Sequence, residues 1–145
     1  MIDVKIKRLN PSAITPTQAN YNDAGWDLYA NVPDELYIFP HCTEMVPTGF
    51  AWAIPSGCFG GVYARSGLAS KQGLRPANCV GVVDSDYRGE VMVALHNDTD
   101  EVKKINHGDR IAQLIVQPFV DVGLMEVDEL DDTARGTGGF GSSGI

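Results

Sequence analysis

Short runs of alternating apolar and polar residues recur along the chain and are separated by Gly and Pro. Val4 and Ile6 alternate with Lys5 and Lys7, which is the period of a strand with one buried face. Further strands are expected at residues 36–39, 50–54, 59–64, 91–96, 111–119 and 120–127, which are rich in β-branched or aromatic residues. Many short strands with such turns predict an all-β sandwich, barrel or jelly roll.

One segment has the pattern of a helix, and it is short. Ser66 is expected to act as its N-cap, and Leu68 and Ala69 favour the helical conformation. Gly73 can end it in the left-handed conformation. No internal repeat or linker divides the 145 residues, so a single domain is expected.

The apolar content is sufficient for a packed core but not for a membrane span. Hydrophobic residues make up 43% of the chain, yet no run of 18 apolar residues occurs. The first residues lack the charged-then-apolar layout of a secretory signal. We therefore expect a cytoplasmic protein without membrane contact.

The acidic balance of the chain restricts its partners. Eleven basic and nineteen acidic residues give a formal charge of −8, which disfavours binding of DNA or RNA because phosphate neutralisation dominates that affinity. Any phosphorylated ligand should be small and should meet a local cluster of donors together with a metal ion. Cys42, Cys58 and Cys79 are far apart and odd in number, so free thiols are favoured over a disulfide or zinc site.

Four stretches are unusually rich in small and polar residues. They are residues 24–30 (AGWDLYA), 64–70 (ARSGLAS), 81–90 (GVVDSDYRGE) and 108–115 (GDRIAQLI). Each has a structural explanation when taken singly. Asp27 could serve a turn, Ser66 could cap the helix, and Arg110 could form a surface ion pair with Asp109. Asp84 and Asp86 are expected in a hairpin, where two close carboxylates carry an electrostatic cost.

The last eleven residues, 135–145 (RGTGGFGSSGI), include five glycines. Composition leaves two interpretations open, a disordered tail and a lid that wraps phosphate groups.

These five stretches resemble, in sequence and order, the five motifs of the homotrimeric dUTPase family. The resemblance spans residues 24–144, and the pair GVVDSDYRGE and RGTGGFGSSG is its most specific part. Two departures, Ala64 for a frequent Pro and Ser143 for a frequent Thr, supply no essential chemistry. The resemblance implies a distorted jelly-roll β-barrel over residues 1–134 and a flexible glycine-rich lid over residues 135–145.

The same resemblance implies an activity, the hydrolysis of dUTP to dUMP and pyrophosphate with Mg²⁺. This reaction supplies dUMP for thymidylate synthesis and keeps uracil out of DNA. It also implies a homotrimer whose active sites are shared between subunits. The third motif would come from one chain, the tail from another, and the remaining motifs from the third.

Site roles follow from the resemblance, residue by residue. Asp84 matches the base that activates the attacking water, and Asp86 is its local competitor. The phosphate chain would be bound by Arg65, Ser66, Gly67 and Gln113, with Arg135 and Ser142 closing on the γ-phosphate. Phosphate oxygens and water would hold Mg²⁺, with no direct protein ligand and with Asp27 touching that shell through water.

Selectivity has its own expected residues. Backbone groups near Asn78, Val82, Val83 and Met92 would pair with uracil and mismatch cytosine. Tyr87 would pack on the deoxyribose and exclude a 2′-hydroxyl group. In the tail, the residues expected to contact the substrate also include Gly139, Phe140 and Gly141, with the ring of Phe140 stacking over the base.

Two other functions are alternatives on the same fold. A dCTP deaminase would need an acid/base Glu and characteristically lacks the water-activating Asp, whereas Asp84 is present here. A nucleotide-sensing regulatory protein would have no need to keep every catalytic group. Pyrophosphate release from dUTP separates both from the hydrolase.

Overall fold

The computed structural model describes residues 2–139, which form ten strands and one short helix. The strands are β1 (Lys5–Arg8), β2 (Trp26–Tyr29), β3 (Leu36–Ile38), β4 (Thr43–Ala53), β5 (Cys58–Tyr63), β6 (Leu74–Pro76), β7 (Gly81–Val83), β8 (Glu90–Asn97), β9 (Lys103–Ile105) and β10 (Arg110–Pro118). The helix is α1 (Ser66–Gln72). The all-β class with one short helix is confirmed. The helix has seven residues, and no helix of the described residues is long and apolar enough to cross a membrane.

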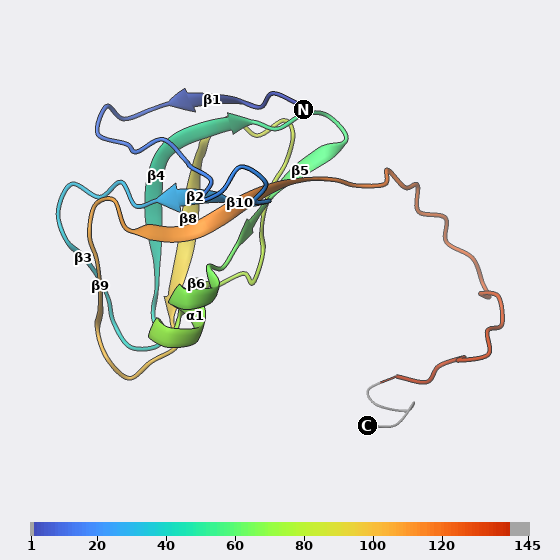
Figure 1. Ribbon diagram of the computed structural model, residues 1–145. Helices are drawn as coiled ribbons and strands as arrows, with labels where there is room; N and C mark the ends of the chain where they lie inside the picture. Colours follow the sequence, from blue (N-terminus) through green and yellow to red (C-terminus); the bar gives the residue numbers. More distant parts are fainter. Residues whose placement is uncertain (1, 140–145) are drawn as a thin grey trace.

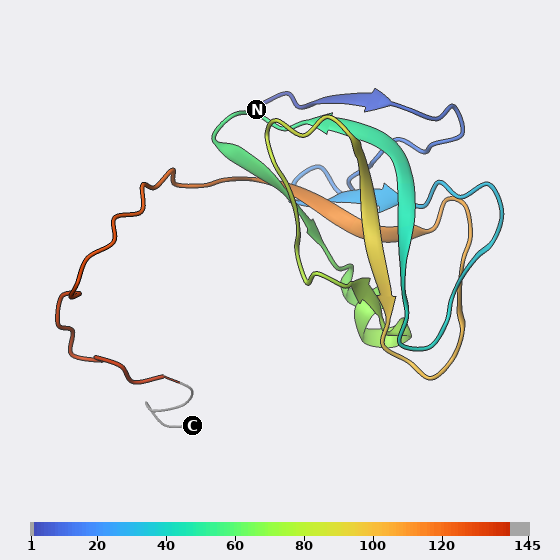
Figure 2. The same cartoon turned by 180° about the vertical axis from the view of Figure 1, so that it is seen from behind.

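The strands pair in two four-stranded sheets and one two-stranded ribbon. One sheet has the order β1-β4-β8-β6, the other has the order β2-β10-β5-β7, and β3 pairs with β9. Every pair is antiparallel. The sheets face each other without closing into one hydrogen-bonded barrel, and α1 lies at one end beside β6 (Figures 1 and 2).

The core lies between the two sheets and follows the alternation of the central strands. On β8, Val91, Val93 and Leu95 are at most 2% exposed, while the residues between them face outward. On β10, Leu114 is fully buried. Burial of each such side chain stabilises the fold by about 1.5–3 kcal/mol. A shift of one residue in strand pairing would turn these side chains toward water, so their burial specifies the register of both sheets.

Two local predictions about the helix start and the third motif need correction. Ser66 is the first helical residue, and the N-cap is Arg65, without a side-chain capping bond. Gly73 does end α1 with φ 65°, as expected. Asp84 and Asp86 do not lie in a hairpin, because β7 pairs with β5 in one sheet and β8 pairs with β4 and β6 in the other. Residues 84–89 therefore cross between sheets.

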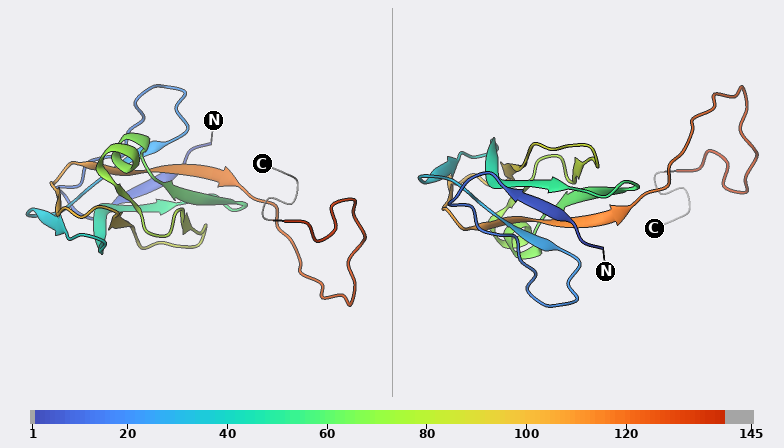
Figure 3. Two further views of the ribbon diagram at one scale, coloured as in Figure 1. Left: turned by 90° about the horizontal axis from the view of Figure 1, so that it is seen from below. Right: turned by 90° about the horizontal axis from the view of Figure 1, so that it is seen from above.

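Residues 120–127 do not form the expected strand. β10 ends at Pro118, and residues 119–139 leave the barrel as an extended arm without helix or strand (Figures 1 and 3). The alternation of Val120 and Val122 is present, but a strand needs a neighbour to accept its backbone hydrogen bonds. Leu124 is 97% exposed and Met125 83% exposed, so these apolar side chains of the arm have no covering surface among the described residues.

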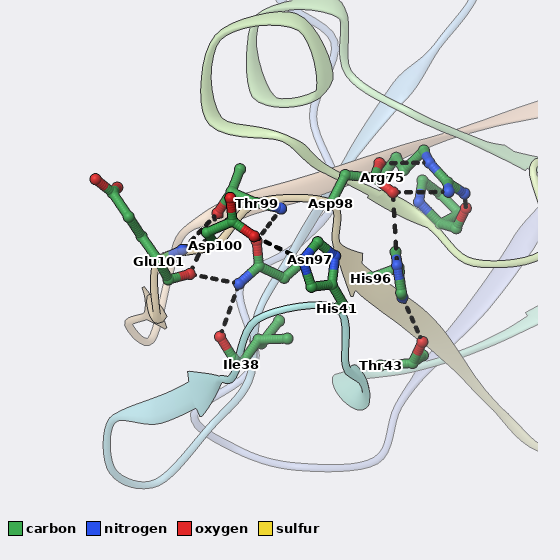
Figure 4. A network of polar contacts seen from close by, with 11 residues as sticks. Ile38, His41, Thr43, Arg75, His96, Asn97, Asp98, Thr99, Asp100 and Glu101 are labelled. Atoms are coloured by element: carbon green, nitrogen blue, oxygen red, sulfur yellow. Dashed lines mark hydrogen bonds and ion pairs between the residues drawn. The ribbon is translucent and has the colours of Figure 1, made fainter.

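A polar network joins β8 to the loops at the same end of the barrel as α1 (Figure 4). Asn97 is fully buried, and its Nδ2 donates to the carbonyls of Ile38 and Glu101 at 3.0 and 2.7 Å. Its Oδ1 accepts from the backbone N and the hydroxyl of Thr99. Nearby, hydrogen bonds from Arg75 lower the pKa of Asp98 below its ordinary value.

Replacing Asn97 with alanine should lower the free energy of unfolding by about 2–4 kcal/mol, because four hydrogen bonds are lost and buried partners remain unpaired. Urea unfolding at fixed protein concentration measures the change. Asn106→Ala is the control, since Asn106 is exposed and should change stability by no more than about 0.5 kcal/mol. Equal effects of the two substitutions would contradict this role for Asn97.

Candidate active site

The first candidate pocket collects predicted residues from β2, β10 and the start of α1. It has a volume of about 410 Å³, and its lining includes Asp27, Arg65, Ser66, Gly67 and Gln113. Strand register explains why these residues lie together, because Gln113 of β10 pairs with Asp27 of β2 on one side and with Tyr63 of β5 on the other. We call this cavity the phosphate pocket.

Gln113 is held in place by its surroundings. Its Nε2 donates to the carbonyl of Ala64 at 2.9 Å, next to Arg65. A Cβ at Gly25 would lie 2.4 Å from Oε1 of Gln113, so a larger residue at position 25 would displace the amide of Gln113. The amide of Gln113 is thereby fixed beside the junction of β5 and α1.

Asp27 is the buried anion of this pocket. It is 8% exposed, its Oδ1 accepts from Nε of Arg65 at 2.8 Å, and its Oδ2 accepts from Nη1 of Arg110 at 3.2 Å. Neither the turn role for Asp27 nor the surface pair of Arg110 with Asp109 is found. Asp109 accepts instead from the backbone N of Asn106. The pocket therefore places two guanidinium groups around one carboxylate.

The first backbone N–H groups of α1 have no hydrogen-bond acceptor within the helix, as at the start of every α-helix. Ser66 and Gly67 belong to this first turn and are exposed in the pocket lining. With Arg65 as the N-cap, these amides and a guanidinium lie at one wall. Such a group of donors suits phosphate oxygens.

The second pocket gathers the predicted residues of the third motif. It has a volume of about 280 Å³, and its lining includes Asn78, Val82, Val83, Asp84, Tyr87 and Met92. The turn after β7 is braced by Tyr87, whose backbone N donates to the carbonyl of Asp84 at 3.2 Å and whose hydroxyl donates to the carbonyl of Glu90 at 3.0 Å. The carboxyl group of Asp84 is exposed. We call this cavity the nucleoside pocket.

The two pockets have no lining residue in common. One chain thus divides the predicted site into a phosphate part and a nucleoside part. Arg135 and Gly139 lie on the extended arm, where Nε of Arg135 donates to the carbonyl of Gly138 at 2.7 Å. The predictions for Phe140, Gly141 and Ser142 lie outside the described residues.

Comparison with known proteins agrees with this sequence and geometry. A family model described as dUTPase matches residues 11–144, nearly the whole chain. The chain belongs to the dUTPase family. The deoxyuridine 5'-triphosphate nucleotidohydrolase of Syntrophotalea carbinolica is 45% identical over 144 residues, covering 99% of this chain and 98% of that protein. The protein of the same name from Corynebacterium glutamicum is 46% identical over 142 residues, covering 97% and 94%.

Solved dUTPase structures share the fold. The Staphylococcus bacteriophage 80alpha dUTPase with dUPNHPP superposes on all of this chain and all of its own with a TM-score of 0.91, at 27% identity. The G164S mutant of the same dUTPase with dUpNHpp gives a TM-score of 0.90 at 26% identity, again with full coverage. The predicted jelly-roll architecture of dUTPases is thereby confirmed.

Two residues that the sequence did not single out for the site lie in or beside the two pockets. Arg110 binds the pocket carboxylate Asp27, and its place three residues before Gln113 was the available signal. Glu90 lines the nucleoside pocket, and its Oε1 accepts from the backbone N of Gly49 at 2.6 Å. No sequence signal connects Glu90 with Gly49, because strand pairing of β8 with β4 brings them together.

Proposed function

We propose that this member of the dUTPase family hydrolyses dUTP to dUMP and pyrophosphate, with Asp84 activating the attacking water. The observation that carries the activity is the family match over residues 11–144, which includes the four inner motifs and the glycine-rich end. Relatives 45% and 46% identical are named deoxyuridine 5'-triphosphate nucleotidohydrolase. The product supplies thymidylate synthesis, and removal of dUTP keeps uracil out of DNA.

The phosphate pocket binds the triphosphate in this proposal. Ser66 and Gly67 donate backbone hydrogen bonds, Arg65 donates from its guanidinium, and Gln113 supports the chain of phosphates from β10, beside the start of α1. The donors are grouped on rigid elements, the start of α1 and the centre of β10. Preorganised donors of this kind stabilise developing charge at no reorganisation cost.

Asp84 is the base of the reaction step. Its carboxylate takes a proton from water while the water oxygen forms a bond to the α-phosphorus. The bond from the α-phosphorus to the bridging oxygen breaks, and pyrophosphate leaves with that oxygen. Positioned base catalysis contributes about 10²–10⁴ in rate, and orientation of the water contributes further.

The nucleoside pocket provides selectivity. Backbone groups of β7 and its flanks, at Asn78, Val82 and Val83, pair with the edge of uracil, and Met92 closes the wall. Cytosine presents an amino group where uracil presents an oxygen, so fixed backbone partners would be left unpaired. The ring of Tyr87, anchored through its hydroxyl to Glu90, leaves no room for a 2′-hydroxyl group.

Magnesium enters with the substrate in this proposal. The described residues contain no group of three His, Cys, Asp or Glu placed to hold a metal ion, and both oxygens of Asp27 accept from arginines. This donor set fits an ion that phosphate oxygens and water ligate, the arrangement that Mg²⁺ prefers. Asp27 would contact the water shell of the ion only through a carboxylate lone pair that neither arginine uses. The ion neutralises phosphate charge, and the chain supplies position and the base.

The complete site requires more than one chain. The phosphate pocket and the nucleoside pocket are separate in one chain, whereas dUTP has its phosphates joined to its nucleoside. A homotrimer solves this if the nucleoside pocket of one subunit faces the phosphate pocket of the next. The extended arm is long enough to carry the glycine-rich end to a site formed by two other subunits. The 17 residues that follow Pro118, up to and including Arg135, span up to roughly 55 Å when extended.

The arm itself supports assembly with further copies of this chain. Its exposed apolar residues, including Leu124 and Leu130 at 97% and 87%, need a partner surface in water. β1 is an edge strand with Lys5, Lys7 and Arg8, and it borders an apolar groove lined by Trp52 among others. The acidic residues of the arm between 121 and 132 complement this basic edge. We assign the groove to the arm of a second copy.

The glycine-rich residues 135–145 form the lid. Arg135 and Ser142 contact the γ-phosphate, Phe140 stacks over uracil, and Gly139 and Gly141 allow the backbone to approach the phosphates closely. Closure over the bound nucleotide would exclude water from the site apart from the nucleophile. We expect residues 1–134 to fold without this segment, because its described part, residues 135–139, contributes nothing to the core.

The test of this function is pyrophosphate release from dUTP, dCTP, dTTP and UTP, each with and without Mg²⁺. Rapid release from dUTP with Mg²⁺, and at least about 10²-fold lower kcat/KM for the other three, is the expected result. Ammonia release from dCTP would identify a deaminase instead. Tight dUTP binding without turnover would identify a nucleotide-sensing protein.

A further inference from the structure

The carboxylate of Asp27 is shared between two arginines from different elements. Arg65, at the start of α1, donates to Oδ1 at 2.8 Å, and Arg110, at the start of β10, donates to Oδ2 at 3.2 Å. Asp27 and Arg65 line the phosphate pocket, whereas Arg110 does not. The side chain of Asp27 is 12% exposed and that of Arg110 is 47% exposed. Arg110 therefore contacts the pocket only through Asp27.

A bulge in β10 creates this contact. The pairing of β10 with β2 shifts register between Arg110 and Ala112. Arg110 and Gln113 are three residues apart and would face opposite sides of a regular strand. One extra residue places both on the outward side, where Asp27 lies opposite Gln113. Bulges of this kind re-aim a side chain and are frequent beside active sites.

The charge count of the pocket explains why a second arginine is needed. Its lining includes the carboxylates of Asp23 and Asp27 and the guanidinium of Arg65, a formal sum of −1. Adding Arg110 behind Asp27 brings the sum to zero. A triphosphate is strongly anionic, and the whole chain already carries −8. Without Arg110, the pocket would carry a formal charge of −1 and would bind an anionic ligand more weakly.

Arg110 also affects the donors of Arg65. With Oδ2 occupied by Arg110, Asp27 engages Arg65 through Nε alone. A carboxylate with both oxygens free readily takes an arginine in the two-bond fork arrangement, which would draw an Nη group away from the phosphates. Arg110 thus leaves the Nη groups of Arg65 available to the ligand.

We propose that Arg110 is a positioning residue that sets the charge of the phosphate pocket and the donor pattern of Arg65 through Asp27. The proposal deepens the function given above and rests on it. It makes a specific claim about charge. Removing Arg110 alone takes the pocket to −1, whereas removing the charges of both Asp27 and Arg110 returns it to zero.

The experiment measures dissociation constants for a non-hydrolysable dUTP analogue and for dUMP, in the full chain, with Arg110→Gln, Arg110→Lys, Asp27→Asn and the double variant Asp27→Asn/Arg110→Gln. Arg110→Gln should weaken binding of the analogue about tenfold, since one unit charge acts on several charges of the triphosphate, each by up to about 1 kcal/mol in a water-like medium. Binding of dUMP should change much less, because it carries one phosphate. The double variant should bind the analogue more tightly than Arg110→Gln does.

Two further variants test whether the charge at position 110 causes the effect. Arg110→Lys keeps that charge, and Lys71→Gln controls for a change in the net charge of the protein. The lysine variant keeps the cation and should stay within about threefold of the wild-type affinity. Lys71→Gln, at the far end of α1, removes one positive charge outside the pocket lining and should change the affinity less than about twofold. Thermal melts confirm that each variant is folded.

Three results would overturn the proposal. They are wild-type affinity in Arg110→Gln, a double variant that binds no better than Arg110→Gln, and a Lys71→Gln variant as weak as Arg110→Gln. Failure of the proposed function looks different. In that case the wild-type chain would itself bind no dUTP analogue, or it would bind dUTP without releasing pyrophosphate.

Discussion

Replacing Asp84 with asparagine is expected to lower kcat for dUTP by about 10²-fold or more while binding of a non-hydrolysable dUTP analogue stays nearly unchanged. Asparagine keeps the size of the side chain and one acceptor oxygen, but it cannot take the proton from water. Asp84 is exposed at the turn after β7 and lines the nucleoside pocket, so the substitution leaves the core intact. Initial rates of pyrophosphate release and equilibrium binding measure the two effects separately.

Asp86 supplies the matched control, because it is a carboxylate two residues away in the same turn and is not among the residues that line either pocket. Asp86→Asn should retain kcat within about threefold of the wild type, the scale of an indirect effect. Near-normal turnover in Asp84→Asn together with loss in Asp86→Asn would transfer the role of base to Asp86.

Ending the chain at Ala134 should leave a folded protein whose kcat/KM for dUTP is lower by about 10²–10³-fold, the scale of losing preorganised phosphate donors. The removed segment carries Arg135 and the glycine-rich lid, and the core of the described residues does not include it. Urea unfolding should give the wild-type midpoint, which shows that the loss is not one of folding.

Hydrogen exchange tests the lid independently of rates. Residues 135–145 should gain protection when the dUTP analogue binds, and less when dUMP binds, because dUMP lacks the γ-phosphate that Arg135 and Ser142 contact. A truncated protein with full activity would contradict the lid. Equal exchange with and without the analogue would contradict it as well.

The sequence alone predicted the class of fold and most of the strands, because alternation reports which face of a strand is buried. β8 illustrates this, since Val91, Val93 and Leu95 alternate in the sequence and are buried in the structure. The same signal failed at residues 120–127, where alternation is present but no strand forms in this chain. Alternation specifies a face to be covered and says nothing of whether the covering strand belongs to the same chain.

Contacts made by distant residues could not be predicted. Asp27 and Arg110 are 83 positions apart, and their contact depends on a bulge that no local propensity marks. The helix was located correctly, yet Arg65 and not Ser66 is its N-cap, since the β5–α1 junction fixes where the chain turns. The motifs supplied the candidate site residues, whereas the division of these residues between two pockets followed only from the arrangement of the sheets.

The most direct test of a shared dUTP-hydrolysing site is to mix two inactive proteins, the Asp84→Asn variant and the chain that ends at Ala134, under conditions that allow subunits to exchange. A site works only if its Asp84 comes from a truncated chain and its lid from an Asp84→Asn chain. With equal and random mixing in a closed trimer, these two independent chances of one half leave about one quarter of the sites active. We expect pyrophosphate release from dUTP at roughly that fraction of the wild-type rate, far above either parent. No rescue, with mixed trimers confirmed by native mass spectrometry, would show that Asp84 and the lid act within one chain and would contradict the shared site.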